Sequence, residues 1–183
     1  VPTSPVIFMK PSASLLADGK NFDIPSFTND LHYEGELVLR VSKQGKNLKA
    51  VNVIDYCDAI TVGIDFTARD LQAKLKEKGL PWEKAKAFNG SAFVSTMLPF
   101  EASLLDNPIH FSLHKNETLV QDGNSGLMIW NVAELIEDVS KYFTLKTGDY
   151  IFTGTPAGVG PIAIGDVLKG SLEGQKLFEL TIS

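Results

Sequence analysis

The sequence predicts a β-rich α+β domain, and three observations support this. The run at 31–42 alternates polar and apolar residues, which is typical of a strand. Segments with strand character outnumber those with helical spacing. The chain also has no internal repeat and no regular alternation of strand and helix, which argues against repeat and βαβ architectures.

Length and composition set the limits of this fold. The 183 residues, 44% of them hydrophobic, suit one globular domain with its own core. The net charge is −5 and no stripe of Lys and Arg is present, so nucleic acid is not expected as a partner. No segment approaches the roughly 20 apolar residues of a membrane span, and the first residues do not resemble a signal peptide. Cys57, the single cysteine, excludes an internal disulfide, which favours a reducing compartment. It suits the apolar side of a helix and is interpreted as core packing.

The first half of the chain predicts a short extended segment at 8–11 and a loop over 12–30, rich in Ser, Asp, Asn and Pro. A strand follows at 31–42, LHYEGELVLRVS, with an acidic patch on one face. The apolar residues of 51–60, VNVIDYCDAI, lie near helical spacing, and 61–66, TVGIDF, predicts a buried strand.

The second half opens with a helix over 67–79, TARDLQAKLKEKG, in which Thr67 is the expected N-terminal cap and Gly79 ends the helix. The run 109–123 alternates about a polar turn and predicts a β-hairpin, and 131–143 predicts an amphipathic helix. Three further strands are expected, at 149–156, 166–174 and 177–183.

Three carboxylates are candidates for a metal site. Glu34 and Glu36 are two apart on a strand, so they project from the same face with their Cα atoms about 7 Å apart. Converging acids in apolar surroundings repel each other unless a cation neutralises them. Asp65 ends the next buried strand, and oxygen ligands without His or Cys favour Mg²⁺ or Mn²⁺ over zinc. Alternatively, Glu34 and Glu36 simply occupy a solvated strand face.

A second candidate group follows Asp65. Arg69 and Gln72 share one face of the predicted helix, and Lys86 comes later in GLPWEKAKAF. A forked cation, an amide and an ammonium would together suit a carboxylate and a carbonyl beside a metal. Spacing alone favours the alternative that these are ordinary surface residues.

Other motifs carry less chemistry. The glycine-rich loop TGTPAGVG, 153–160, lacks the GK[ST] and GxGxxG patterns, so it presents Thr153 or Thr155 to a ligand or forms a tight structural turn. His110 and His114 are about 13 Å apart along a strand, too far to share a metal readily. No GxSxG elbow is present, which leaves a serine-hydrolase interpretation without support.

The ordered series of motifs resembles the fumarylacetoacetate hydrolase family, and most closely its short, single-domain acylpyruvate hydrolase and oxaloacetate decarboxylase branch. The resemblance runs from about Val6 to the C-terminus. It rests on FMKP, LHYEGEL, GIDFTARDLQ, GLPWEKAKAF, GDYIFTGTPAGVGP and the late GD, in this order.

The resemblance implies a mixed β-sheet roll, a homodimer, and the location of the site. It implies that Mg²⁺ or Mn²⁺ is bound by Glu34, Glu36 and Asp65. It also implies that the substrate is contacted by Arg69, Gln72, Lys86 and Thr155, of which Arg69 and Lys86 are the catalytic candidates.

The expected reaction is metal-dependent cleavage of a C–C bond in small 2-oxo acids, by acylpyruvate hydrolysis or oxaloacetate decarboxylation through a metal-stabilised pyruvate enolate. An isomerase or tautomerase on the same site is one alternative. A non-catalytic, metal-stabilised binding domain is another. The expected location is the cytoplasm, or the mitochondrion if the source is eukaryotic.

The sequence departs from the family pattern in one respect. Short members begin with a strand and a segment resembling NYxxHxxE, whose His and Glu form the catalytic pair on a mobile lid. We therefore expect 1–183 to form a single catalytic domain without its N-terminal strand and lid segment. If the general base lies within these residues instead, His32 is the first candidate.

Overall fold

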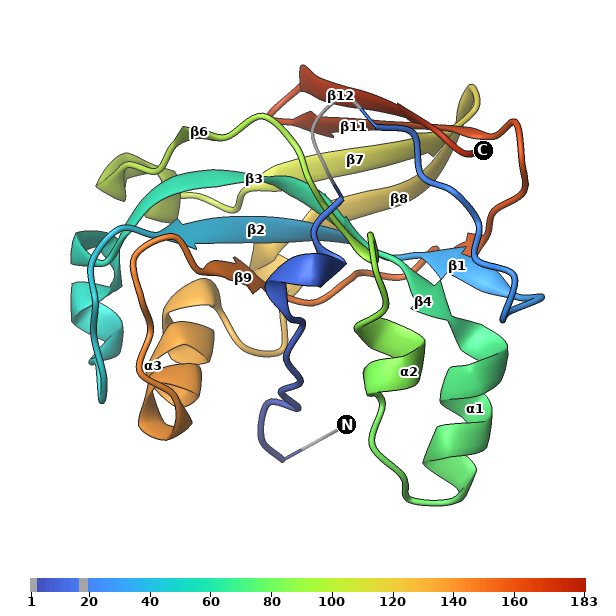
Figure 1. Cartoon of the computed structure of the whole chain (residues 1–183). Coiled ribbons are helices and arrows are strands. Elements are labelled where there is room, and N and C mark those ends of the chain that lie inside the picture. Colours follow the sequence, from blue (N-terminus) through green and yellow to red (C-terminus); the bar gives the residue numbers. More distant parts are fainter. Residues whose placement is uncertain (1–2, 17–19) are drawn as a thin grey trace.

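Two curled β-sheets packed against each other dominate the computed structural model, which describes residues 3–16 and 20–183 (Figure 1). One sheet has the order β5-β3-β2-β9, with β6 also paired to β3, and the other has the order β12-β11-β7-β8. A small third sheet joins β10, β1 and β4. The prediction of a β-rich α+β domain is confirmed. The strands are β1 Leu31–Tyr33, β2 Gly35–Val41, β3 Cys57–Asp65, β4 Thr67–Ala68, β5 Ala92–Val94, β6 Leu98–Pro99, β7 His110–Lys115, β8 Thr118–Asn124, β9 Tyr150–Phe152, β10 Gly160–Pro161, β11 Val167–Leu172 and β12 Gln175–Thr181.

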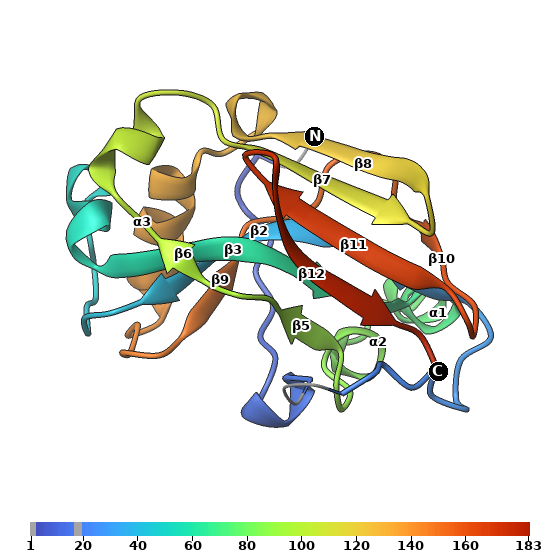
Figure 2. The ribbon, with the colours of Figure 1, turned by 90° about the horizontal axis from the view of Figure 1, so that it is seen from above.

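The helices flank the sheets. Helices α1 (Arg69–Glu77) and α2 (Glu83–Lys86) lie together near one end of the β2–β3 pair, and α3 (Val132–Tyr142) lies near the other end (Figures 1 and 2). No helix among the described residues is long and apolar enough to cross a membrane. The short 3-10 turns are η1 Ser12–Ser14, η2 Ala50–Asp55, η3 Ala102–Leu105 and η4 Ser125–Leu127.

Pairing between the named strands is antiparallel. Parallel pairing occurs at isolated bridges, between Leu15 and Ala92 and between Phe22 and Ile182. These bridges hold the N-terminal segment against β5 and the end of β12, the edge strands of the two large sheets.

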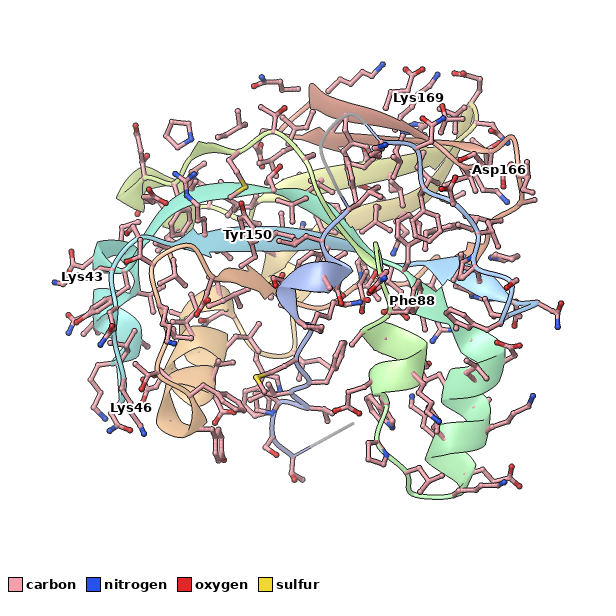
Figure 3. All side chains as sticks on the ribbon, viewed as in Figure 1. Lys43, Lys46, Phe88, Tyr150, Asp166 and Lys169 are labelled. Carbon is pink, nitrogen blue, oxygen red and sulfur yellow. The ribbon has the colours of Figure 1, made fainter. Side chains whose placement is uncertain are left out.

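The core lies between the two large sheets. Figure 3 shows side chains filling this space, while Lys43 and Lys169 project outward at opposite ends of the molecule. Strands β2 and β3 are buried on both faces along most of their length. Phe22 and Phe66 stack inside the core with ring centroids 3.8 Å apart, and Cys57 is buried as expected.

The predicted helix over 51–60 is wrong after its first turns. The 3-10 turn η2 ends at Asp55, and β3 begins at Cys57. Val53 and Ile60 are both buried, as a helical stripe would require. Their branched side chains suit a strand as well, and pairing with β2 decides between the two structures.

The helix predicted after position 67 exists, but Thr67 does not cap it. Helix α1 begins at Arg69, its N-cap position is Ala68, and no side chain caps it. Thr67 lies in β4, where its hydroxyl accepts a hydrogen bond from Lys86 Nζ at 2.6 Å. The Thr67 hydroxyl therefore bonds to a residue distant in the sequence and does not cap the helix that follows it.

The two later predictions are confirmed. The hairpin forms as β7 and β8, with Asn116 in the turn at φ 56°. Helix α3 begins with Asn131 in a capping box, in which the Asn131 side chain and Glu134 each accept from the other's backbone amide.

Candidate active site

Three buried carboxylates meet where β2 and β3 pair. Gly35 lies opposite Ile64, and the amide of Asp65 donates to the carbonyl of Glu34 at 2.8 Å, so the ends of the strands are held together. Glu34, Glu36 and Asp65 are 8%, 5% and 2% exposed, and one oxygen from each lies within 4.8 Å of the others. The fold therefore brings together the three acids that the sequence proposed as ligands.

Lys86 enters this cluster from α2. Its Nζ lies 2.7 Å from Glu34 Oε2 and 2.7 Å from Asp65 Oδ2, and the residue is 3% exposed. It is thus a fully buried cation and not an ordinary surface lysine. A buried ammonium held by two carboxylates is a fixed positive charge at the centre of the site.

Arg69 reaches the same cluster from the first turn of α1. Its Nη2 donates to Glu34 Oε1 at 2.6 Å, and its Nη1 donates to Gln72 Oε1 at 2.6 Å. The forked guanidinium therefore links one carboxylate to one amide. Arg69 and Lys86 therefore contact the acids directly, and Gln72 is linked to them through Arg69.

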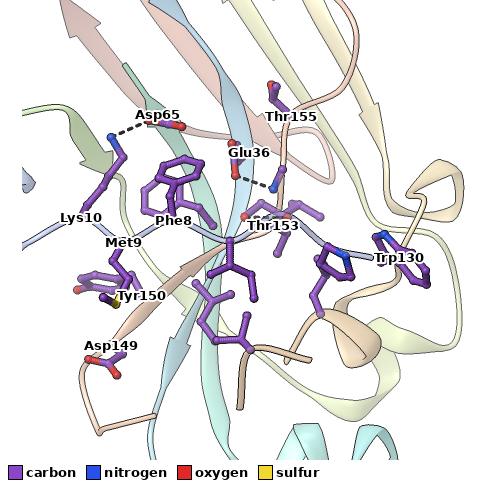
Figure 4. A pocket seen from close by; sticks show the side chains of 18 of the residues that line it. Phe8, Met9, Lys10, Glu36, Asp65, Trp130, Asp149, Tyr150, Thr153 and Thr155 are labelled. Atoms are coloured by element: carbon purple, nitrogen blue, oxygen red, sulfur yellow. Dashed lines mark hydrogen bonds and ion pairs between the residues drawn. The ribbon is translucent and has the colours of Figure 1, made fainter. Parts of the chain in front are cut away.

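Lys10 also belongs to the site, and the sequence interpretation gave it no role. Its Nζ lies 2.7 Å from Asp65 Oδ1 and 2.9 Å from Ser91 Oγ, and it contacts the carbonyl of Lys86 (Figure 4). The available signal was the lysine of FMKP, but 55 positions separate it from Asp65 and no local pattern connects them.

The electrostatics of the two glutamates differ. Burial, together with the charges of Asp65 and Glu34, raises the pKa of Glu36 to about 8, although the amide of Gly154 donates to its Oε2 at 2.6 Å. Burial would raise the pKa of Glu34 too, but Lys86 and Arg69 outweigh it and hold this pKa below its ordinary value.

The surroundings of Glu36 show whether a cation would fit among the three carboxylates. Within the described residues, no Lys, Arg or His lies within ion-pair distance of Glu36. A buried carboxylate beside two others is costly unless it is protonated or neutralised. A hard divalent cation would supply the missing neutralisation, and an all-oxygen donor set suits Mg²⁺ or Mn²⁺.

The glycine-rich loop passes beside Glu36. It leaves β9 at Thr153, whose hydroxyl donates to Leu37 O at 3.0 Å, and turns at Gly154 with φ 97°. Thr155 Oγ1 then donates to Gly35 O at 2.8 Å. No helix follows the loop in the described structure, so it has neither the sequence nor the geometry of a nucleotide-binding loop.

A cavity of about 1140 Å³ opens onto part of the cluster. Figure 4 shows Lys10, Glu36 and Asp65 on one side of it, with Phe8 close by and Trp130 farther away. Thr153 and Thr155 also line the cavity, whereas the residues of the cluster that do not line it are Glu34, Arg69, Gln72 and Lys86.

The histidines lie outside this cluster. His32 Nε2 is 2.9 Å from Asp30 Oδ1, and its Nδ1 has no hydrogen-bond partner among the described residues. His110 and His114 lie on β7, and neither belongs to the group of acids that could hold a metal.

The chain is similar in sequence and fold to known enzymes. A family model described as fumarylacetoacetate (FAA) hydrolase C-terminal matches residues 1–182. The chain is 37% identical to the mitochondrial oxaloacetate tautomerase FAHD1 of Bos taurus, over 94% of this chain and 78% of that protein. It is 34% identical to the mitochondrial oxaloacetate decarboxylase of Dictyostelium discoideum, over 95% and 80%. The fold matches that of fumarylpyruvate hydrolase from Pseudomonas aeruginosa, solved with Mn²⁺ and pyruvate. That match has a TM-score of 0.86 and 34% identity, and it covers 96% of this chain and 77% of that one.

Proposed function

The chain belongs to the fumarylacetoacetate hydrolase family and is an enzyme, and from this premise we propose that it acts on small 2-oxo acids with a divalent metal held by Glu34, Glu36 and Asp65. The reaction we propose is cleavage of a C–C bond, either hydrolysis of an acylpyruvate or decarboxylation of oxaloacetate, through an enolate of pyruvate. Mg²⁺ and Mn²⁺ are the proposed ions.

The observation that carries this proposal is the environment of Glu36. It is the one member of the three carboxylates without an ion pair among the described residues, and it faces the cavity. Stability does not favour such an arrangement, because a buried acid beside two others loses hydration and gains a backbone amide but no cation as a partner. Binding of an external cation provides a physical reason for it.

The bound ion would supply Lewis-acid chemistry by drawing electron density from the oxygens of the 2-oxo acid. Lys86 adds a fixed positive charge beside Glu34 and Asp65, where it would stabilise negative charge that develops on the substrate. Arg69 and Gln72, already linked to each other, are the proposed holders of the substrate carboxylate.

Thr155 is proposed as a wall of the substrate site. Its hydroxyl already donates its proton to Gly35 O. Thr155 would therefore contact a substrate in the cavity through its other atoms and not by donating a hydrogen bond from the hydroxyl.

A tautomerase is the second candidate, because a relative with 37% identity is named oxaloacetate tautomerase. In both reactions negative charge would develop on the oxygen of the 2-oxo group, and they differ in whether a C–C bond breaks. Product analysis separates them. Oxaloacetate and an acylpyruvate should each be incubated with metal-loaded protein and followed by NMR. Release of pyruvate supports the proposed cleavage, and a change in the keto–enol ratio alone supports the tautomerase.

Three further features are proposed on the resemblance alone. The chain would form one catalytic domain over 1–183, assemble as a homodimer, and work in the cytoplasm or the mitochondrion. Light scattering in solution tests the dimer directly.

A further inference from the structure

On the side away from β3, the backbone of Gly35, between the two glutamates, is held by side chains and not by a strand. Strand β9 pairs with β2 only opposite Val38–Arg40, and after Thr153 the chain turns away. The backbone amide and carbonyl of Gly35 would pair with β9 if that strand continued, but they bind side chains instead. Its amide donates to Gln121 Oε1 at 2.8 Å, and its carbonyl accepts from Thr155 Oγ1 at 2.8 Å.

Gln121 connects these two contacts. It projects from β8, is 1% exposed, and donates from Nε2 to Thr155 Oγ1 at 2.8 Å and to Pro156 O at 3.2 Å. One amide side chain therefore binds both the ligand strand and the loop beside Glu36. Every polar atom of this side chain has a protein partner, as a buried polar group requires.

Close packing leaves this network little room to shift. A Cβ atom at Gly35 would lie 2.9 Å from Gln121 Oε1. A Cβ atom at Gly158, which has φ 101°, would lie 2.0 Å from the carbonyl oxygen of Val120. These two glycines allow the ligand strand and the loop to approach β8 closely, which explains part of the glycine content of the loop.

We propose that Gln121 is a positioning residue for the carboxylate site. By fixing the amide of Gly35 directly, and its carbonyl through Thr155, it holds Glu34 and Glu36 at the separation that a divalent cation requires. Partners behind the ligands of a metal commonly control ligand orientation, and their loss typically weakens metal binding about 10- to 100-fold. This inference rests on the proposed metal-binding function, and it adds a residue that contacts neither ion nor substrate.

The test is Mn²⁺ binding by metal-stripped protein, measured by calorimetry, with thermal unfolding measured alongside. Gln121→Met keeps the side-chain length and removes every hydrogen bond. Thr61→Val is the matched control, because Thr61 is fully buried on β3 and bonds to Ser95 and Thr96 away from the site. Both variants should lose stability. Only Gln121→Met should bind Mn²⁺ more weakly, by about tenfold or more.

Equal Mn²⁺ affinity in Gln121→Met and Thr61→Val would overturn the inference and leave the proposed function standing. Failure of the wild type to bind Mn²⁺ would overturn both. If Gln121→Met does not fold, Thr155 provides the same test. Thr155→Val should weaken Mn²⁺ binding and Thr155→Ser, which keeps the hydroxyl, should restore it. Wild-type affinity in Thr155→Val would overturn the inference.

Discussion

The two ends of the β2–β3 ladder each carry carboxylates paired with cations, but in opposite surroundings. At one end, Arg40 donates from Nε and Nη2 to the two oxygens of Asp58, at 2.9 Å each, and these side chains are 40% and 46% exposed. At the other end, the side chains of Lys86 and Asp65 are 4% and 3% exposed and lie 2.7 Å apart.

The difference teaches what each cluster contributes. Water screens the exposed pair, and holding two long side chains in place costs entropy, so its effect on stability is small. At the buried end, ions have lost their hydration, and their mutual attraction often fails to exceed that loss. Stability therefore gives no reason to keep the buried acids, whereas a role in binding does.

The largest effect is expected from Glu36→Gln at the buried end. This change keeps the shape of the side chain and removes one proposed ligand charge. Metal-dependent turnover should fall by at least about 10³-fold, because a bound ion contributes several kcal/mol to the transition state. Steady-state assays with Mg²⁺ or Mn²⁺ measure this. Asp58→Asn, at the exposed end of the same ladder, should retain turnover, and full activity in Glu36→Gln would refute the ligand assignment.

Replacement of the arginines should give the next largest difference. The chain contains two arginines, Arg69 at the buried end and Arg40 at the exposed end, so the same substitution can be compared at both. Arg69→Lys should lower kcat/KM about 10- to 100-fold, because an ammonium cannot bridge Glu34 and Gln72 as the guanidinium does. Arg40→Lys should leave it unchanged. Equal kinetics for the two variants would make Arg69 a structural residue only.

The stability of the metal-free protein should depend on pH through the buried end. The pKa of Glu36 in the fold, about 8, lies above its ordinary value of 4.5. Its contribution to stability is therefore complete below about pH 4.5 and is lost as pH rises through about 8. Tm of protein kept in a chelator should fall between about pH 5.5 and 8, and Glu36→Gln should flatten this fall. Parallel profiles for the two proteins would contradict the assigned pKa.

The smallest effect is expected from Arg40→Ala. The exposed pair holds the pKa of Asp58 below its ordinary value, chiefly through the hydrogen bond from Arg40, yet solvent surrounds both groups. Tm should change by no more than about 2 °C, and Mn²⁺ affinity should not change. A large loss of either would mean that the two ends of the ladder are coupled.

Local pattern predicted the parts of the fold that depend on local interactions. Alternation predicted one strand over 31–42, and the structure divides it at Glu34 into β1 and β2. The apolar spacing of 131–143 predicted α3, which begins in a capping box complete within four residues. The resemblance to a family then indicated that Asp65, Arg69 and Lys86 would join the glutamates, and the fold brings these five residues together.

The remaining features depend on contacts between distant residues. Gln121 is 86 positions from Gly35, and a polar residue on a hairpin strand gives no sign that it will be buried. Thr67 resembled a helix cap because the cap motif is local. In the structure its hydroxyl instead accepts a hydrogen bond from the buried ammonium of Lys86. In both cases the packing of the whole chain decides the partner.

The register of β2 on β3 has a consequence for how the chain avoids misfolding. Glu36 lies opposite Gly63, and Leu37 lies opposite Val62. A slip of one residue would exchange the two faces of β2, moving Glu36, and with it Glu34 just before the strand, to the side now taken by Leu37 and Leu39. Two carboxylates would then enter the buried layer of Leu37 and Leu39, away from Lys86 and Arg69, while leucines replaced them beside Lys86. Any substitution that makes the carboxylate site more apolar would therefore also weaken the penalty that keeps these two strands in register during folding.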